Sequence, residues 1–563
     1  MKHLLIGCGS QYIHVNLAVW YLRASCAVQS IPVTVLETTV NQPLHAQLLR
    51  VLEEAPDTVA FSCYLWNIET VLRLSKDIKT ILPHVKIVLG GPEVSFDAPA
   101  LRKSHPHIDY ILCGEGETAY PALLKRIESA ALPSGACDTD DWAVSDLDTL
   151  PSPYTEEMLD SARGRIVYYE SSRGCPFRCA YCLSPACGPV RTFSLERVEQ
   201  DLRTLAGAGV SLIKFVDRTF NWNRNRALSI LNLLKKLPDG IRYHFEIGGD
   251  LLDEALVSAL LSFPAGTFQL EMGVQSTHPA TLTEICRSEN TAEIFAHAKT
   301  IMTSEKIHLH MDLIAGLPYE GLAEFERSFN EVYACRPHTL QLGFLKLLKG
   351  SALHRDADEY GIRYRDYPPY EVLETPWLPA QALLSLGHTE DVLDRMYNSG
   401  RFTRTVRHLE RFFPSPFEMY HTLGCALQKH SASRPVSALE LYTLVYNTAC
   451  KLDGVDSALL CDLLRCDQYA AAVTGKIPGI PEEDAEVKKA MIRAFLDDEQ
   501  ALFAHFPHLS GLSRRERNGR LRFMLSMHNP GSGEKMPRPA LIAFDPLCKN
   551  SVNGLLPNIL IKS

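Results

Sequence analysis

The sequence predicts an α/β protein in three parts, and three features of the chain lead to that prediction. Residues 1–128 alternate strand-like and helix-like segments, the pattern of a parallel, doubly wound sheet. Residues 164–372 repeat strand and helix six times, enough for most of a barrel built like an eight-fold one. After residue 372 the strand-like runs fade and helical spacing takes over. We therefore expect a doubly wound domain, a partial (β/α)6 barrel and a mostly helical C-terminal domain.

The N-terminal domain is expected to contain five short apolar strands separated by amphipathic helices. The strands are predicted at 3–8, 32–37, 58–65, 86–91 and 108–116, and the helices at 16–26, 67–83 and 119–129. Ligands of such sheets bind beyond the carboxyl ends of the strands. Those ends are rich in glycine here, which makes them candidate ligand loops.

A linker and the barrel follow. Residues 129–163 include a stretch rich in Asp, Ser and Pro with little periodicity, which indicates a linker. The barrel strands are predicted at 165–171, 211–217, 241–247, 268–274, 307–316 and 339–347, with helices at 195–209 and 228–237 among them. The functional site of such a barrel is expected at the C-terminal ends of its strands.

The C-terminal region, residues 373–563, is expected to be mainly helical. Helices are predicted at 409–430, 436–452 and 457–473, and a short β pair at 520–527 and 540–547. Cys461 and Cys466 lie five apart on one of these helices, and with no second pair nearby they are interpreted as buried thiols.

Composition excludes several classes of protein. The 563 residues include 57 Lys and Arg against 66 Asp and Glu, a net charge of −9, which argues against nucleic acid as a partner. No stretch approaches the roughly 18 apolar residues of a membrane span, and no secretory leader is visible, so we expect a cytoplasmic protein. The 16 cysteines are scattered without secretory features, which favours free thiols plus one ligand cluster.

That ligand cluster is the loop "RGCPFRCAYC", which places Cys175, Cys179 and Cys182 in a C-x3-C-x2-C pattern. Three thiolates suit an iron–sulfur cubane with one iron left open for a ligand. Structural zinc with Cys187 as the fourth ligand is the alternative, although zinc sites usually split their ligands into two distant pairs.

A C-x3-C-x2-C loop that follows the first strand of a six-strand α/β segment resembles the radical S-adenosylmethionine (SAM) superfamily. The resemblance implies a [4Fe–4S] cluster held by the three cysteines, with SAM chelating the open iron. An electron from the cluster would then cleave SAM to a 5′-deoxyadenosyl radical. The stretches "EMGVQS" (271–276) and "DLIAGLP" (312–318) look like motifs of the coproporphyrinogen-dehydrogenase branch of that superfamily.

The same resemblance implies the residues that contact SAM. Gln275 and Asp312 would contact its ribose and methionine part, and Arg287 would pair with the methionine carboxylate. The remaining SAM contacts are Tyr181, whose backbone would border adenine, Gly316, which would admit adenine to the backbone, and Asp217, which would meet the methionine amino group. The glycine-rich motif usual near that last position is absent, and "FVDRTFN" stands there instead.

A doubly wound domain directly before such a barrel resembles the cobalamin-binding class of radical SAM proteins. "FSCYLWN", "VLGGPEVS" and "YILCGEGE" match the strand-end signatures of that class. The cobalamin-binding positions implied are Ser62, Leu65, Gly90, Gly91 and Gly114. The chain has no Asp-x-His-x-x-Gly motif to ligate cobalt, and His14 is interpreted as structural. Dinucleotide binding at "GCGSQY" and a purely structural domain are the alternatives.

The resemblance implies a radical SAM enzyme that transfers a methyl group from cobalamin to an unactivated carbon. A cobalamin-associated rearrangement, cyclisation or oxidation is the alternative, and a non-catalytic iron–sulfur sensor is a second one. The substrate is expected to be a small molecule, lipid or peptide, and the electron donor a flavodoxin or ferredoxin. Catalytic residues are not legible, and four side chains near strand ends or at barrel-facing positions are interpreted as packing, or as supporting the site from behind, rather than as catalytic: Trp222, Tyr243, Glu246 and His310. The C-terminal extension could cap the barrel or hold substrate.

Overall fold

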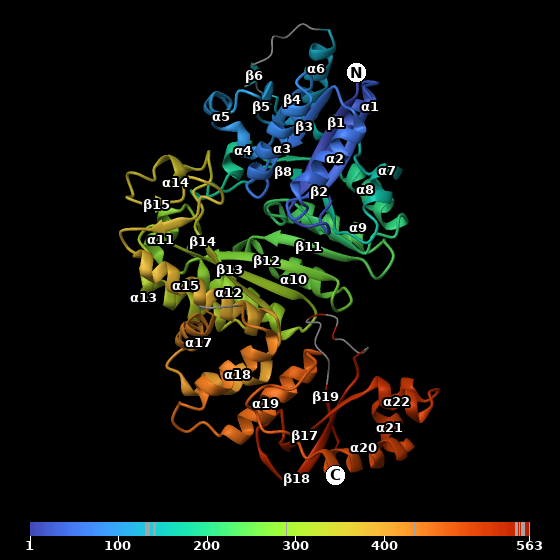
Figure 1. Ribbon diagram of the computed structural model, residues 1–563, viewed down its shortest axis with the longest axis vertical. Coiled ribbons are helices and arrows are strands. Elements are labelled where there is room, and N and C mark those ends of the chain that lie inside the picture. The colour runs from blue at the N-terminus through green and yellow to red at the C-terminus, as the bar shows by residue number, and fades with distance from the viewer. Residues whose placement is uncertain are drawn as a thin grey trace.

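The structure is a computed structural model that describes residues 1–129, 136–138, 142–288, 290–431, 435–546, 550, 552 and 558–561. Three layers follow one another along the longest axis in Figure 1. The N-terminal sheet (blue) is at one end, the second sheet (green to yellow) is in the middle, and the C-terminal helices (orange to red) are at the other end. The predicted three-part α/β fold is confirmed.

The N-terminal domain is a parallel sheet with strand order β2-β1-β3-β4-β5-β6. Its strands are β1 His3–Gly9, β2 Val33–Thr39, β3 Thr58–Ser62, β4 Lys86–Gly90, β5 Tyr110–Leu112 and β6 Ala136–Asp138. Its helices are α1 Leu17–Val28, α2 Leu44–Glu54, α3 Ile68–Ile81, α4 Pro92–Ser95, α5 Ala98–Ser104 and α6 Gly116–Glu128. Alternate residues of β1 enter different cores: Leu5 belongs to the cluster that includes α1, and Ile6 to the one that includes α3. Helices therefore cover both faces, as in a doubly wound sheet.

The predicted linker is more structured than its composition indicated. Its strand β6 extends the N-terminal sheet, with Leu112 opposite Asp138 in parallel register. A 3-10 turn, η1 Leu147–Thr149, and a helix, α7 Glu156–Ser161, follow it. A three-residue strand leaves no periodicity to detect, which explains why the sequence did not reveal it.

The middle domain is a six-stranded parallel sheet with order β14-β13-β12-β11-β10-β7. Its strands are β7 Val167–Tyr169, β10 Leu212–Phe215, β11 Arg242–Ile247, β12 Phe268–Gln275, β13 His308–Ala315 and β14 Thr339–Phe344. Its helices are α8 Leu195–Gly207, α9 Arg224–Leu234, α10 Glu254–Leu261, α11 Pro279–Glu284, α12 Thr291–Thr303 and α13 Leu322–Tyr333. On β12 buried residues alternate with half-buried ones, so one face packs in the core while Glu271, Gly273 and Gln275 face the cavity described below.

Between β14 and the C-terminal region lies a segment that contains α14 Ala352–Arg355, β15 Arg363–Tyr364 and β16 Val372–Glu374. The helices after it are α15 Ala380–Leu393, the π-turn η4 Asp394–Asn398, α16 Thr403–Leu409, η5 Glu410–Phe412, α17 Pro416–Ser431, α18 Ala438–Ala449 and α19 Ser457–Ala470. The chain continues with α20 Ala485–Asp497, α21 Glu499–His505, η6 Pro507–Leu509 and α22 Arg514–Arg520, and with strands β17 Arg522–His528, β18 Lys535–Phe544 and β19 Asn558–Ile561. The predicted β pair is antiparallel β17–β18, joined by β19. Cys461 and Cys466 are buried free thiols, as predicted. Over the described part of the chain, no helix has the length and apolar character needed to span a membrane.

Candidate functional site

The three motif cysteines lie in a loop closed at its base by two short strands. β8 (Ser172–Arg173) and β9 (Arg191–Thr192) pair antiparallel, with Arg173 opposite Arg191. Gly174 has φ +88°, and a Cβ there would lie 2.8 Å from the Pro189 carbonyl oxygen. A larger residue at 174 would therefore force the base of this cysteine loop (174–190) apart.

Each of the three thiols has a polar neighbour that can support a thiolate. The Cys175 sulfur is 3.6 Å from the Thr219 hydroxyl, and the Cys182 sulfur accepts the Ser184 N–H at 3.3 Å. The Arg287 guanidinium reaches the Cys179 sulfur at 3.8 Å. Burial raises the pKa of Cys179, and the Arg287 charge opposes that effect. Hydrogen bonds to sulfur are the usual means by which a protein tunes a thiolate-bound metal group.

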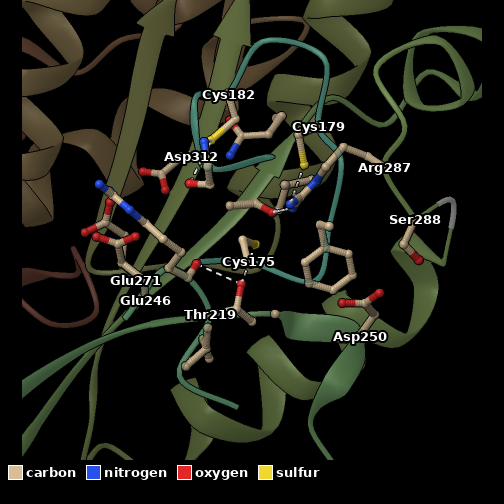
Figure 2. A pocket seen from close by; sticks show the side chains of 18 of the residues that line it. Cys175, Cys179, Cys182, Thr219, Glu246, Asp250, Glu271, Arg287, Ser288 and Asp312 are labelled. Atoms are coloured by element: carbon tan, nitrogen blue, oxygen red, sulfur yellow. Dashed lines mark hydrogen bonds between the residues drawn. The ribbon is translucent and has the colours of Figure 1, made fainter. Parts of the chain in front are cut away.

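The thiols open onto one cavity of about 200 Å³, seen from close by in Figure 2. It lies at the carboxyl ends of β10 to β13, where the barrel architecture predicts a site. Beside the cysteines, its polar lining consists of Tyr181, Ser184, Arg218, Thr219, Glu246, Asp250, Glu271, Gln275, Arg287, Ser288, Thr291 and Asp312. Four predicted SAM contacts are thus brought together at the thiols: Tyr181, Gln275, Arg287 and Asp312.

Gln275 ends β12 in an unusual conformation. Its φ is +72°, in the left-handed region that residues other than glycine rarely adopt, and the pairing with β13 shifts register at this point. Gly273 leaves room for the Gln275 side chain, because a Cβ there would lie 2.3 Å from its amide nitrogen. The Gln275 Oε1 is buried with no hydrogen-bond partner among the described residues. A strained residue with an unsatisfied acceptor aimed at a cavity is typical of a ligand contact.

Arg287 is held by the same strand end. Its guanidinium donates to the Gly273 carbonyl oxygen as well as approaching Cys179. The preceding residue, Cys286, also has a positive φ of +55°. The cation is therefore fixed between the cysteine loop and β12, where it can meet an anionic ligand group.

Ionisable side chains from neighbouring strands surround the rest of the cavity. Asp312 lies 3.0 Å from His310, in a geometry that makes no hydrogen bond, and burial raises the pKa of its carboxyl. A hydrogen bond from His244, 3.1 Å away, lowers the pKa of Glu271 to about 2. Burial raises the pKa of Glu246 to about 7. The cavity thus combines an ionised carboxylate with one that titrates near neutral pH.

Two predicted SAM contacts lie elsewhere. Asp217 is 2% exposed, and its carboxylate accepts hydrogen bonds from the Ser171 N–H, the Ser171 hydroxyl and the Ser172 hydroxyl at 2.5–3.0 Å. These bonds hold the chain just before the cysteine loop and leave Asp217 outside the cavity lining. Gly316 has φ +91°, and a Cβ there would lie 2.8 Å from the Val372 side chain, so packing accounts for this glycine. Their proposed SAM roles remain predictions.

Of the four side chains interpreted as packing, Glu246 alone lines the cavity. Tyr243 is buried in the core, Trp222 is half-buried outside the lining, and His310 contacts Asp312. Sequence reasoning also missed Arg218, Thr219, Asp250 and Glu271. The two-residue spacing of Glu271, Gly273 and Gln275 was the signal that could have identified Glu271.

The carboxyl end of the N-terminal sheet carries the predicted cobalamin positions. Gly114 has φ +81°, and nothing lies within 4 Å of where its Cβ would be, so this loop offers open space. Trp66 is 50% exposed and stacks on Tyr64 with ring centroids 4.4 Å apart, next to half-buried Leu65. An exposed aromatic plane at the same sheet edge as an open glycine loop fits a flat macrocycle.

The other predicted cobalamin positions have structural explanations of their own. Gly91 has φ +114°, and a Cβ there would lie 2.5 Å from the Cys63 carbonyl oxygen. Ser62 is buried and its carbonyl oxygen accepts the Asn67 side-chain amide, while Gly90 has only ordinary contacts with Leu112. Their cobalamin roles remain predictions.

His14 is a contact between domains. Its Nδ1 lies 2.8 Å from the Tyr168 hydroxyl, and its carbonyl oxygen accepts Arg165 of the barrel. Burial lowers the pKa of its ring. This environment agrees with the structural role that the sequence suggested.

Comparison with known families agrees with this division of the chain. A model of the B12 binding domain matches residues 5–124, and a model of the radical SAM superfamily matches residues 169–332. The chain carries a B12 binding domain followed by a radical SAM domain. A third model, described as a protein of unknown function (DUF4080), matches residues 358–526 of this radical SAM protein.

Several curated proteins are similar to this radical SAM protein. The cobalamin-dependent radical SAM methyltransferase TokK of Streptomyces tokunonensis is 27% identical over 58% of the chain. The hopanoid C-3 methylase of Methylococcus capsulatus is 30% identical over 37% of the chain. The chain spans 52% of TokK and 43% of the methylase, about half the length of these relatives.

Solved structures show the same fold. The cobalamin-dependent SAM radical enzyme OxsB, with aqua-cobalamin and SAM bound, has a TM-score of 0.58 at 14% identity, covering 84% of this chain and 82% of OxsB. The radical SAM methyltransferase TsrM of Kitasatospora setae has a TM-score of 0.52 at 16% identity, covering 66% of this chain and 82% of TsrM.

The two matched domains imply a [4Fe–4S] cluster, SAM and cobalamin, and the residues present suit all three. Three thiols with polar neighbours converge on one cavity. In the described part of the chain, no three His, Cys, Asp or Glu side chains are placed to hold a single metal ion. The side chain of Cys187, the alternative zinc ligand, lies outside the described residues.

Proposed function

We propose that this protein is a radical SAM enzyme that transfers a methyl group to an unactivated carbon with the help of cobalamin. The observation that carries the proposal is the convergence of Cys175, Cys179 and Cys182 on one cavity lined by Arg287, Gln275 and Asp312. When bound, the reduced cluster supplies an electron that cleaves SAM, and cobalamin supplies the methyl group.

The chain's own residues are proposed to bind and orient SAM. Arg287, fixed by Gly273, is proposed to hold the SAM carboxylate, because a buried guanidinium forms strong charge-assisted bonds with an anion. The unsatisfied oxygens of Gln275 and Asp312 are proposed to accept the ribose hydroxyls. Tyr181 is proposed to border adenine from between the second and third cysteines.

The partners follow from this chemistry. We propose that the substrate is a small molecule, lipid or peptide that reaches the cavity, and that the electron donor is a flavodoxin or ferredoxin. A cytoplasmic location would supply both a reducing environment and such donors. The cavity volume of about 200 Å³ is small, so the cavity would admit only the reacting part of a large substrate beside SAM.

The test is anaerobic reconstitution of the full chain with iron and sulfide, followed by reduction with SAM and hydroxocobalamin. The expected result is a cubane EPR signal that SAM perturbs, release of 5′-deoxyadenosine and a bound corrinoid absorption. Transfer of a labelled methyl group to a substrate would then distinguish methylation from rearrangement or oxidation. A cluster that forms but never cleaves SAM would instead favour a sensor.

Cysteine variants test the metal site directly. Cys175→Ala, Cys179→Ala and Cys182→Ala are each expected to abolish the cubane signal, because a cubane needs its thiolates. Cys461→Ala is the matched control, since Cys461 is a buried free thiol of α19 remote from the cysteine loop in sequence. Retention of the full iron content by the three motif variants would contradict the proposed site.

A further inference from the structure

The base of the cysteine loop carries two arginines that face the other domain. Arg173 of β8 and Arg191 of β9 are cross-strand partners, and the three cysteines lie between them in sequence. Both side chains are only 12% exposed. Buried guanidinium groups need partners, and these find theirs in the N-terminal domain.

Two glutamates at the start of α6 provide these partners: Glu115, which caps the helix, and Glu117 in its first turn. Glu115 binds Arg191 through two hydrogen bonds of 3.0 and 2.5 Å, and lies 3.5 Å from Arg173. Glu117 pairs with Arg173, which also binds Glu170 of the barrel at 3.0 Å. Burial opposes ionisation of Glu115, but the bonds from Arg191 and the Val144 N–H lower its pKa. We call the four residues Arg173, Arg191, Glu115 and Glu117 the arginine clamp.

A second contact joins the neighbouring loop of the N-terminal sheet to the cysteine loop. Lys349 lies 3.6 Å from Glu93 and 2.8 Å from Asp97, both in the loop region after β4. The same segment, between β14 and the C-terminal region, donates a backbone hydrogen bond from Leu353 to Ala180, at 2.9 Å. Ala180 lies directly after Cys179, so this segment connects the loop after β4 to the cysteine loop.

The glutamates that make these contacts lie close in sequence to the glycines predicted to bind cobalamin. Gly114 directly precedes Glu115, and Gly91 lies two residues before Glu93. Both glycine positions proposed to bind cobalamin are therefore followed by carboxylates that bind cations: Glu115 binds Arg191 at the base of the cysteine loop, and Glu93 lies near Lys349. A ligand that orders the loop around open Gly114 would also restrain the arginines at the base of the cysteine loop.

We propose that the arginine clamp is a positioning device that couples occupancy of the cobalamin site to the order of the cysteine loop. The inference rests on the proposed function, because it needs cobalamin to bind at the Gly114 loop. A bidentate pair fixes both distance and orientation, so the clamp would set how the corrinoid faces the cluster.

The experiment measures hydrogen exchange of amides 174–190 in the full chain, after anaerobic reconstitution, with and without hydroxocobalamin as the probe. In the unmodified protein, hydroxocobalamin is expected to slow exchange in this segment about fivefold or more. In Glu115→Gln and Glu117→Gln, which keep the side-chain shape, the corrinoid band should persist while this slowing is lost. Glu199→Gln, which breaks an exposed pair with Arg203 on α8, is the control and should behave like the unmodified protein.

The outcomes separate the inference from the proposed function. Hydroxocobalamin that binds without slowing exchange at 174–190 would overturn the clamp alone. Hydroxocobalamin that never binds would overturn both the clamp and the cobalamin-dependent function. If the glutamine variants fail to fold, Arg191→Lys keeps the charge without the two parallel bonds and should give an intermediate slowing. An Arg191→Lys protein with full slowing would also overturn the clamp.

Discussion

At the scale of single residues, two of the buried polar atoms that the protein leaves without a hydrogen bond belong to residues that line the cavity. Gln275 Oε1 and Asp312 Oδ1 are buried without hydrogen-bond partners among the described residues. Leaving such groups unpaired costs about 1–3 kcal/mol each, so their presence indicates a ligand that completes them. Asp217 is the contrast, because three bonds to Ser171 and Ser172 already satisfy its carboxylate.

Arg287 gives the first prediction at this scale. Arg287→Lys keeps the positive charge but removes the planar guanidinium, which can donate two parallel hydrogen bonds to a carboxylate. The affinity for SAM is therefore expected to weaken roughly tenfold or more. The cubane signal itself should remain, because Arg287 approaches the Cys179 sulfur without being a cluster ligand. A SAM titration followed by EPR of the reduced cluster measures the effect, with Arg203→Lys on α8 as the control. An unchanged titration would argue against the carboxylate contact.

Glu271 gives a pH-dependent prediction. The hydrogen bond from His244 lowers the pKa of Glu271 to about 2, so the ionised form is favoured in the folded state. The resulting stability is present above the ordinary pKa near 4.5 and is lost as pH falls toward 2. Glu271→Gln should therefore destabilise the protein by roughly 1–3 kcal/mol at pH 6 and progressively less below pH ~4.5. Thermal midpoints of both proteins across this range are the measurement, and a gap that stays constant with pH would contradict the assignment.

The candidate site residues that could be predicted from the sequence are those that belong to short local motifs. The cysteines stand within eight positions, and Gln275 and Asp312 lie in short motifs at strand ends. Glu115 and Arg191 could not be paired in advance, because 76 positions separate them and only the docking of two domains brings them together. The adenine role predicted for Gly316 stays a prediction, because a strand-end glycine has two explanations and the close approach of Val372 is the second one.

At the scale of elements, one side chain makes the two backbone hydrogen bonds at the edge of the barrel sheet that a neighbouring strand would otherwise make. Asn398, at the end of η4, accepts the Leu340 N–H and donates to the Leu340 carbonyl oxygen, both at 2.9 Å. Leu340 belongs to β14, the last strand of the sheet order. Edge strands that stay unpaired invite aggregation, so this contact ties the C-terminal region to the sheet.

Asn398→Ala should remove both bonds and cost about 1–3 kcal/mol, because it leaves a partly buried backbone pair unsatisfied. Faster hydrogen exchange at the Leu340 amide and a lower thermal midpoint are the expected results. Asn225→Ala, on the exposed surface of α9, is the control and should change neither quantity measurably. Exchange at Leu340 that does not change would show that the edge is held by other contacts.

The elements that the sequence predicted are long enough to show a period. β12 and β13 are eight residues each and alternate buried with half-buried positions throughout. β8 and β9 have two residues each and exist because their arginines bind the other domain, so no local pattern could indicate them. The C-terminal helices were predicted from helical spacing, but the hydrogen bonds of Asn398 to β14 could not be read from that spacing.

At the scale of the whole molecule, the C-terminal region divides into two parts with different relations to the barrel. One continuous hydrophobic core runs from Leu5 through the barrel to Ile480. The side chains of Val372 and Leu383 belong to it and pack over Gly316. The last part has a core of its own, formed by residues between Phe495 and Ala543. The sequence indicated an extension after residue 372, and the continuous core crosses that position and includes residues up to Ile480.

This division predicts opposite outcomes for two truncations. A chain that ends at residue 372 would lose α15 and α17 and expose the core beside β14, so it is expected to aggregate. A chain that ends at residue 481 keeps the whole continuous core and exposes the face of α19 that packs on β17, near Cys466 and Ala470. It should remain monodisperse by size-exclusion chromatography, bind iron and show the SAM-perturbed EPR signal. If the longer chain kept its cluster but lost turnover of an identified substrate, the terminal part would be assigned to substrate binding. If instead the chain ending at 372 kept both iron and SAM binding, the continuity of the core would not determine stability in this protein.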